Sequence, residues 1–186
     1  MELRRVVVTG LGALTPVGNT LQEYWDGLVS GRSGAVPITK FDAEKFKTRF
    51  ACEVKGFDPT AFIDRKEARK MDPFSQYAVV TADEAIRDSG LELEKEDRDQ
   101  IGVIWGSGIG GLQTFQDECF NFAKGDGTPR FNPFFIPKMI ADSASGLISM
   151  RHGLRGPSYV TVSACASSNN SMIDAFNYIR LGMCTA

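Results

Sequence analysis

The hydrophobic pattern of this chain alternates between short apolar runs and longer amphipathic stretches. Apolar, β-branched runs typical of buried strands occur at residues 4–9, 101–105 and 160–162. Apolar residues at helical spacing predict helices over residues 21–30, 61–70, 74–89, 112–123, 137–150 and 169–181. Strands that alternate with helices predict an α/β fold, with a mostly parallel sheet and helices on both faces.

Boundary residues support several of these helices. Asn19 and Thr20 are suitable caps for the first helix, and Pro73 and Gly90 bracket the helix at 74–89. Residues 35–71 combine short apolar pieces with two prolines and a basic cluster, without one consistent period. We interpret this region as an excursion from the layered fold, with a small helix near residues 61–70.

The apolar period changes from about 2 to about 3.6 within a few residues of Cys165. This change places a thiol on the tight turn where a strand leads into a helix. The positive end of the helix dipole favours thiolate, the reactive form, and the small neighbours leave room for a substrate. The alternative interpretation is a small buried hydrophobic residue, the commonest role of a free cysteine.

Glycines mark the predicted carboxyl ends of the other strands. We expect Gly10, Gly106 and Cys165 at one edge of the sheet, where open α/β sheets bind ligands. Gly106, Gly108 and Gly111 also match the dinucleotide fingerprint, but the strand with a terminal acid expected about 20 residues further on is absent. Close backbone packing explains these glycines better than a nucleotide cofactor.

Other candidate groups are fewer. The single histidine, His152, would have to supply any Cys–His pair within the chain, although a loop histidine is more often a surface residue. The basic cluster at residues 65–70 is either a solvated helix face or a docking patch for an acidic partner.

Composition narrows the function classes. The 186 residues carry a net charge of −2, which gives no general reason to expect a nucleic-acid partner. No apolar run approaches the ~18 residues that span a bilayer, and the N-terminal residues do not resemble a signal peptide. Four widely spaced cysteines without a C-x-x-C motif argue against a zinc site and for a reducing compartment, so we expect a cytoplasmic protein without a bound metal.

Seven motifs then occur in order along the chain. They are Val6–Gly12 (VVVTGLG), Thr15–Asn19 (TPVGN), Arg65–Asp72 (RKEARKMD), Ile104–Gly111 (IWGSGIGG), Asn132–Pro137 (NPFFIP), Gly153–Ser158 (GLRGPS) and Ser163–Ser167 (SACAS). Together they resemble the β-ketoacyl-[acyl-carrier-protein] synthases of the elongating type II class (synthase II). The resemblance spans residues 4–182.

This resemblance implies a thiolase-like α/β fold, with residues 1–186 as the N-terminal half of a duplicated α/β/α/β/α arrangement. It implies an acyltransferase of fatty acid synthesis that loads an acyl group on a cysteine and then condenses it with malonyl carrier protein. The phosphopantetheine arm arrives on the acyl carrier protein, so the enzyme binds no organic cofactor of its own. A homodimer is also implied.

Residue roles follow from the same resemblance. Cys165 matches the nucleophile, and its backbone N–H would supply half of an oxyanion hole. Ile109 matches the residue that gates the acyl pocket, and Phe135 a residue that lines the partner subunit's pocket. The residues that match the basic surface for carrier docking are Lys66, Arg69, Lys70 and Arg130.

The family's two catalytic histidines and its lysine lie in its second half, and His152 stands in no matching motif. We therefore expect that these 186 residues alone do not complete the condensation. Two alternatives remain open: a condensing enzyme of polyketide or secondary lipid synthesis, and a non-catalytic fragment that dimerises or docks carrier protein.

Overall fold

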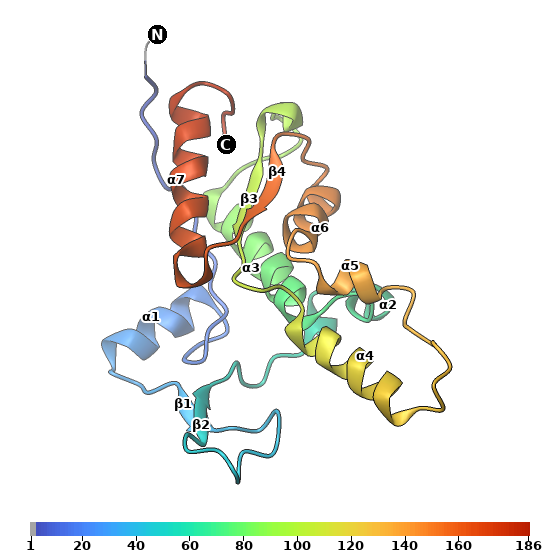
Figure 1. The fold of residues 1–186 in the computed structure, drawn as a ribbon. Helices are drawn as coiled ribbons and strands as arrows, with labels where there is room; N and C mark the ends of the chain where they lie inside the picture. The colour runs from blue at the N-terminus through green and yellow to red at the C-terminus, as the bar shows by residue number, and fades with distance from the viewer. Residues whose placement is uncertain (1–2) are drawn as a thin grey trace.

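The computed structural model describes residues 3–186; Met1 and Glu2, the first residues of the stretch compared with a signal peptide, lie outside it. Figure 1 shows helices grouped around a short pair of strands. The elements in chain order are α1 (Leu21–Val29), β1 (Ala35–Pro37), β2 (Phe50–Cys52), η1 (Pro59–Ala61), α2 (Arg65–Ala68), α3 (Pro73–Ser89), η2 (Arg98–Gln100), β3 (Val103–Gly106), α4 (Leu112–Lys124), α5 (Phe135–Met139), α6 (Ser143–His152), β4 (Ser158–Thr161), η3 (Ala164–Ala166) and α7 (Ser167–Arg180), where η marks a 3₁₀ turn.

Strands β3 and β4 form the parallel pair at the centre of the fold. Their register places Val103 opposite Ser158 and Gly106 opposite Thr161. Helix α7 lies on one side of this pair and α6 on the other (Figure 1). This confirms parallel strands between helices, but a wide parallel sheet is not formed by residues 3–186. The second pair, β1 and β2, is an antiparallel hairpin within the predicted excursion.

The strand predicted at residues 4–9 is wrong. This segment has no strand partner among the described residues, and Val8 is 80% exposed rather than buried. Arg4 is tied instead to the end of α7, where its backbone N–H donates to the Arg180 carbonyl at 3.0 Å. A cavity of about 450 Å³ is lined by Thr9 and Gly10 and also by residues 101–105 of β3 and its approach. The two segments thus line one cavity, and no strand ladder joins them among the described residues.

The region predicted as one helix at 137–150 divides into α5 and α6. The Met139 carbonyl, which would accept a hydrogen bond in a continuous helix, accepts one from the Gly111 N–H at 2.8 Å. Ile140 is correspondingly extended, with ψ at 139°. A contact with the glycine loop therefore ends α5 and lets α6 start in a new direction.

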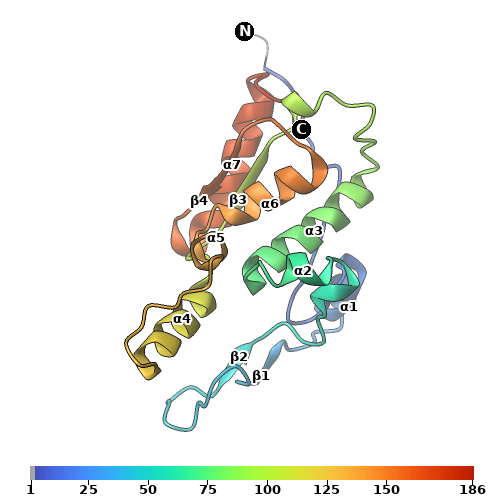
Figure 2. The same ribbon diagram turned by 90° about the vertical axis from the view of Figure 1, so that its right-hand side faces the viewer.

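The hydrophobic core lies between α3, α6 and β3. Ala78 and Val79 of α3 pack with Ala144 and Ile148 of α6 and with Val103 of β3. Figure 2 shows α3 and α6 side by side, with α4 and the β1–β2 hairpin projecting below them. Among residues 3–186 we find no helix with both the length and the apolar character needed to span a bilayer.

Helix α7 packs on the strands with small polar side chains at its start and apolar ones further along. Its buried residues are Ser167 and Ser171, and Ala175 and Ile179 line a small cavity with Ile104 of β3. Met172 and Ile173 are exposed. The apolar spacing therefore predicted the helix correctly but only part of the face that meets the sheet.

Candidate active site around Cys165

Cys165 lies on a turn with unusual backbone geometry at the end of β4. Ala164, just before it, has φ at 49°, the only left-handed non-glycine residue among residues 3–186. This conformation costs an L-residue roughly 1–2 kcal/mol, so the surrounding structure must hold it. Cys165 follows in the 3₁₀ turn η3, and it is an exposed free thiol. The predicted strand–turn–helix placement is confirmed, and the interpretation as a buried hydrophobic residue is wrong.

The hydroxyl of Ser167 holds this turn. It accepts a hydrogen bond from the Ser163 N–H at 2.9 Å and donates one to the Ala164 carbonyl at 2.8 Å. Asn170 adds an outer link, since its amide donates to the Ser163 hydroxyl at 2.6 Å. The residues on either side of Cys165 are therefore fixed from the first turns of α7.

The same helix end is held against the strands by small side chains. The Thr161 hydroxyl donates to the Ser167 carbonyl at 2.8 Å and lies 2.9 Å from the Ser171 hydroxyl. A Cβ placed on Gly106 would lie 2.6 Å from the Ser168 nitrogen, too close for any side chain. Gly106 thus meets helix backbone, which agrees with close packing as the reason for this glycine.

The backbone N–H of Cys165 is available for a ligand. The neighbouring donors are engaged, since Ala166 donates to the Ser163 carbonyl at 3.0 Å and Ser167 to the Ala164 carbonyl. Within residues 3–186, no acceptor is recorded for the N–H of Cys165. A free donor beside an exposed thiol is the arrangement that stabilises the oxyanion formed when the thiol attacks a carbonyl.

The glycine loop after β3 lies next to the turn of Cys165. The Ser107 N–H donates to the Thr161 carbonyl at 3.2 Å, and a Cβ on Gly108 would be in ordinary contact with Ala164. Ile109 follows Gly108 in this loop and is 69% exposed. The structure therefore places the loop that carries Ile109 beside the turn of Cys165, with Ile109 itself at the surface of the described part of the chain.

Phe135 lies in a row of phenylalanines on α4, α5 and the loop between them. Its ring stacks on Phe115 and Phe131, with centroids 6.4 Å and 5.8 Å apart. Its neighbours Phe134 and Ile136 are exposed. These residues form an open apolar surface and not a closed tunnel within residues 3–186.

Asp72 is a site residue that sequence reasoning missed in part. Pro73 predicted the start of α3, and Asp72 just before it accepts a hydrogen bond from the Phe74 N–H at 3.1 Å. The other carboxylate oxygen accepts from the Thr114 hydroxyl at 2.6 Å and from the Thr114 N–H at 3.2 Å. Asp72 therefore also caps α4, whose own N-cap position is Gly111 and has no side-chain cap. No sequence signal links residues 72 and 114.

Three of the four candidate docking residues lie on or just after α2, and a contact of Lys70 links α2 to the loop that carries the fourth, Arg130. Lys66 and Arg69 are exposed on α2 and at its end. Lys70 is paired with Glu67 at 2.7 Å, and its ammonium also lies 5.6 Å from the centroid of the Phe134 ring. This contact joins α2 to the loop that carries Arg130, which is exposed and 4.0 Å from Asp126.

Two sequence candidates lie away from Cys165. His152 ends α6, where its Nε2 lies 2.9 Å from the Asp83 carboxylate, which Arg151 also contacts. It is half-buried and engaged, not a loose surface residue. The close contacts of Gly10 are with Ala85 and Ser89 of α3, and Gly10 lines one cavity with Trp105, the residue before Gly106.

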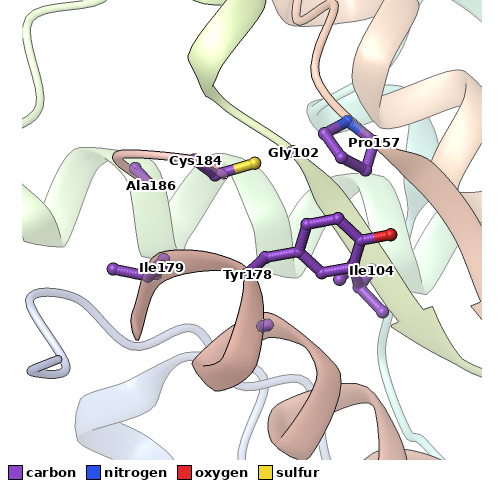
Figure 3. A pocket seen from close by; sticks show the side chains of 8 residues that line it. Gly102, Ile104, Pro157, Tyr178, Ile179, Cys184 and Ala186 are labelled. Carbon is purple, nitrogen blue, oxygen red and sulfur yellow. The ribbon is translucent and has the colours of Figure 1, made fainter. Parts of the chain in front are cut away.

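The other cysteines differ from Cys165 in their surroundings. Cys184 is 2% exposed and lines a cavity of about 40 Å³ between β3 and the end of α7. Figure 3 shows its sulfur beside Gly102 and Pro157, with the Tyr178 ring next to it. Burial raises the pKa of the Cys184 thiol. Cys52 and Cys119 are exposed, but neither follows a strand end with a glycine loop beside it.

Known proteins match this architecture along its whole length. The family model described as "Beta-ketoacyl synthase, N-terminal domain" matches residues 3–186. The 3-oxoacyl-[acyl-carrier-protein] synthase 2 of Synechocystis sp. is 49% identical over 186 residues, which is 100% of this chain and 44% of that protein. The protein of that name from Staphylococcus aureus (strain COL) is 42% identical over 179 residues, 96% of this chain and 43% of that protein.

Solved structures give the same result. "The ishigamide ketosynthase/chain length factor" superposes with a TM-score of 0.90 at 31% identity, covering 98% of this chain and 46% of that one. A β-ketoacyl synthase from Burkholderia phymatum superposes with a TM-score of 0.82 at 26% identity, covering 99% and 45%. The chain thus spans less than half the length of the curated relatives it matches. Because the family model matches residues 3–186, the chain belongs to the β-ketoacyl synthase family, in the part that forms the N-terminal domain.

Proposed function

We propose that this chain provides the acyl-accepting site of a 3-oxoacyl-[acyl-carrier-protein] synthase of fatty acid synthesis. The observation that carries the proposal is the exposed Cys165 thiol beside its own free backbone N–H, on a turn fixed by Ser167. The Cys165 thiolate attacks the carbonyl carbon of an acyl thioester on the carrier's phosphopantetheine arm. The carbonyl oxygen takes up the negative charge next to the Cys165 N–H. The carrier thiolate then leaves, and the acyl group remains on Cys165 as a new thioester.

The second half-reaction joins this acyl group to a two-carbon unit. Malonyl carrier protein loses carbon dioxide, and the resulting carbanion attacks the Cys165 thioester, which forms the carbon–carbon bond and releases the thiolate. The one histidine of this chain, His152, is occupied with Asp83 and does not contact Cys165. The groups that stabilise the enolate would therefore come from outside these 186 residues.

Carrier protein and a second copy are the partners we propose. An acidic carrier would meet the exposed cations Lys66, Arg69 and Arg130, with Lys70 beside them. The exposed phenylalanine row around Phe135 would contribute to a homodimer. The carrier brings its own prosthetic group, so the proposal includes no cofactor bound by this chain. A cytoplasmic location would suit four free thiols.

Acyl transfer from carrier protein tests this proposal. The chain is incubated with fatty acyl carrier protein, and its mass and peptide map are compared with those of the Cys165→Ala variant. The proposal predicts the acyl mass on Cys165 of the wild type and none on the variant. Carrier binding that is equal in both proteins, without acylation of the wild type, would instead identify a non-catalytic docking fragment.

The polyketide alternative is weaker. Identity is higher to the synthase 2 of Synechocystis than to the ishigamide ketosynthase, 49% against 31%. Acyl transfer from both kinds of carrier distinguishes the two, and we expect the faster transfer from the saturated fatty acyl carrier.

A further inference from the structure

The nucleophile turn is held by one buried hydroxyl that does not touch the thiol. Ser167 is 3% exposed, although its neighbours on both sides are exposed. Its Oγ bridges the Ser163 N–H and the Ala164 carbonyl, at 2.9 Å and 2.8 Å. The Ala164 carbonyl belongs to the peptide that joins Ala164 to Cys165, so a bond that holds this carbonyl also sets the direction of Cys165.

Ala164 explains why such a bridge is needed. At φ 49°, an alanine returns to a right-handed or extended conformation unless contacts prevent it. A change at Ala164 would turn the Cys165 N–H and Sγ together, because both follow directly along the chain. The bridge from Ser167 is the side-chain contact that fixes the carbonyl of Ala164.

Ser167 is itself immobilised by the sheet. Its backbone carbonyl accepts hydrogen bonds from the Thr161 hydroxyl at 2.8 Å and from the Ser171 hydroxyl at 3.0 Å. The adjacent backbone of Ser168 rests against Gly106 at the end of β3. The turn of Cys165 is thereby linked to the ends of both parallel strands.

We propose that Ser167 is a positioning residue for Cys165: its hydroxyl holds Ala164 in the left-handed conformation that presents the thiol and its N–H to the same carbonyl. The positioning role of Ser167 rests on the proposed function only in that Cys165 is the nucleophile. Ser167 acts through the turn and not by contact with the acyl group.

Competitive alkylation with iodoacetamide tests the proposal on the full chain. Peptide mapping gives the rate at Cys165 relative to the rate at Cys119, an exposed thiol on α4 in the same molecule. For Ser167→Ala we expect the Cys165-to-Cys119 ratio to fall by about tenfold, the size of one lost hydrogen bond expressed as a rate ratio. Ser167→Thr keeps the hydroxyl and should restore most of the ratio. Ser168→Ala, a matched change at an exposed neighbour with no recorded side-chain hydrogen bond, should leave it unchanged.

A purely structural role would give a different pattern. It would lower the stability of Ser167→Ala but leave the ratio in the folded variant at the wild-type value, and that result would overturn the proposal. A threonine variant as slow as the alanine variant would overturn it as well, because the hydroxyl would not be the active feature.

Amide exchange of the wild type keeps the proposal testable if Ser167→Ala does not fold. The Ser163 amide should exchange at least about tenfold more slowly than the Cys165 amide, although both residues are exposed. Equal exchange at the two amides would overturn the proposal. Failure of carrier-dependent acylation would contradict the proposed function, whereas the Ser163 amide still reports whether Ser167 holds the turn.

Discussion

The buried carboxylate of Asp72 and the hydroxyl of Thr114 form a 2.6 Å hydrogen bond that joins the starts of two helices. Asp72 caps α3 through the Phe74 N–H and caps α4 through the Thr114 N–H. The glycine loop between β3 and α4 ends at Gly111, where a side chain would collide with this carboxylate and with the Lys138 carbonyl. The loop that carries Ile109 is therefore anchored by a residue that directly follows the basic α2 segment.

Replacement of Asp72 by asparagine should weaken this anchor. The amide has one acceptor oxygen, so it leaves a donor of either α3 or α4 without a partner. We expect a loss of about 1–3 kcal/mol in the free energy of unfolding, measured by urea denaturation. Amide exchange over residues 107–114 should also become faster. Asp142→Asn is the matched control, because Asp142 stands at the N-cap of α6 without a side-chain cap. Equal effects of the two changes would contradict the double-cap role.

Two glycines of one loop should respond differently to alanine. Gly106→Ala places a methyl group 2.6 Å from the backbone of α7, so we expect roughly 1–3 kcal/mol of destabilisation. Gly108→Ala meets Ala164 at an ordinary distance of 3.7 Å and should be tolerated. Thermal melts of both variants test this, and equal melting temperatures would show that the close approach at Gly106 can relax.

Charge reversal on α2 should weaken carrier binding. Lys66 and Arg69 are exposed and have no ion pair among residues 3–186, so their field is available to an acidic partner. The double change Lys66→Glu and Arg69→Glu should lower the association rate at low salt by at least about tenfold. The difference should shrink as salt is added. The double change Lys45→Glu and Lys47→Glu, at two exposed lysines in the hairpin loop, alters the net charge by the same amount and is the control. An equal loss there would point to net charge alone.

Cys184 should make the stability sensitive to alkaline pH. Burial raises the pKa of its thiol, so the folded state keeps the proton at pH values where the unfolded chain loses it. The stabilising contribution is complete below the unfolded-state pKa of about 8.5 and is lost as the pH rises through the folded-state value. Urea midpoints between pH 7.5 and 10 should fall less in Cys184→Ala than in the wild type. If the urea midpoint depends on pH in the same way in both proteins, Cys184 is not the source of the alkaline loss of stability.

Local patterns predicted most of what depends on neighbouring residues. Thr20 caps α1 and Pro73 opens α3 as expected, and Cys165 stands between β4 and α7. These features arise from short-range rules of helix starts and strand ends, which the sequence displays directly.

Features that depend on tertiary packing were not predicted. The second bond of Asp72 crosses 42 residues of chain to Thr114. The serine face of α7 meets the strands because Gly106 allows close approach, while the apolar Met172 and Ile173 remain exposed. The segment at residues 4–9 has the composition of a strand, but no neighbour pairs with it among the described residues.

Competitive alkylation of the four cysteines in the wild-type chain measures whether the turn makes Cys165 reactive. We expect Cys165 to react first and Cys52 and Cys119 to react at the slower rate of ordinary exposed thiols. Cys184 should stay protected until the chain unfolds. Equal rates at Cys52, Cys119 and Cys165 would contradict this expectation, because the turn would then give Cys165 no reactivity beyond exposure.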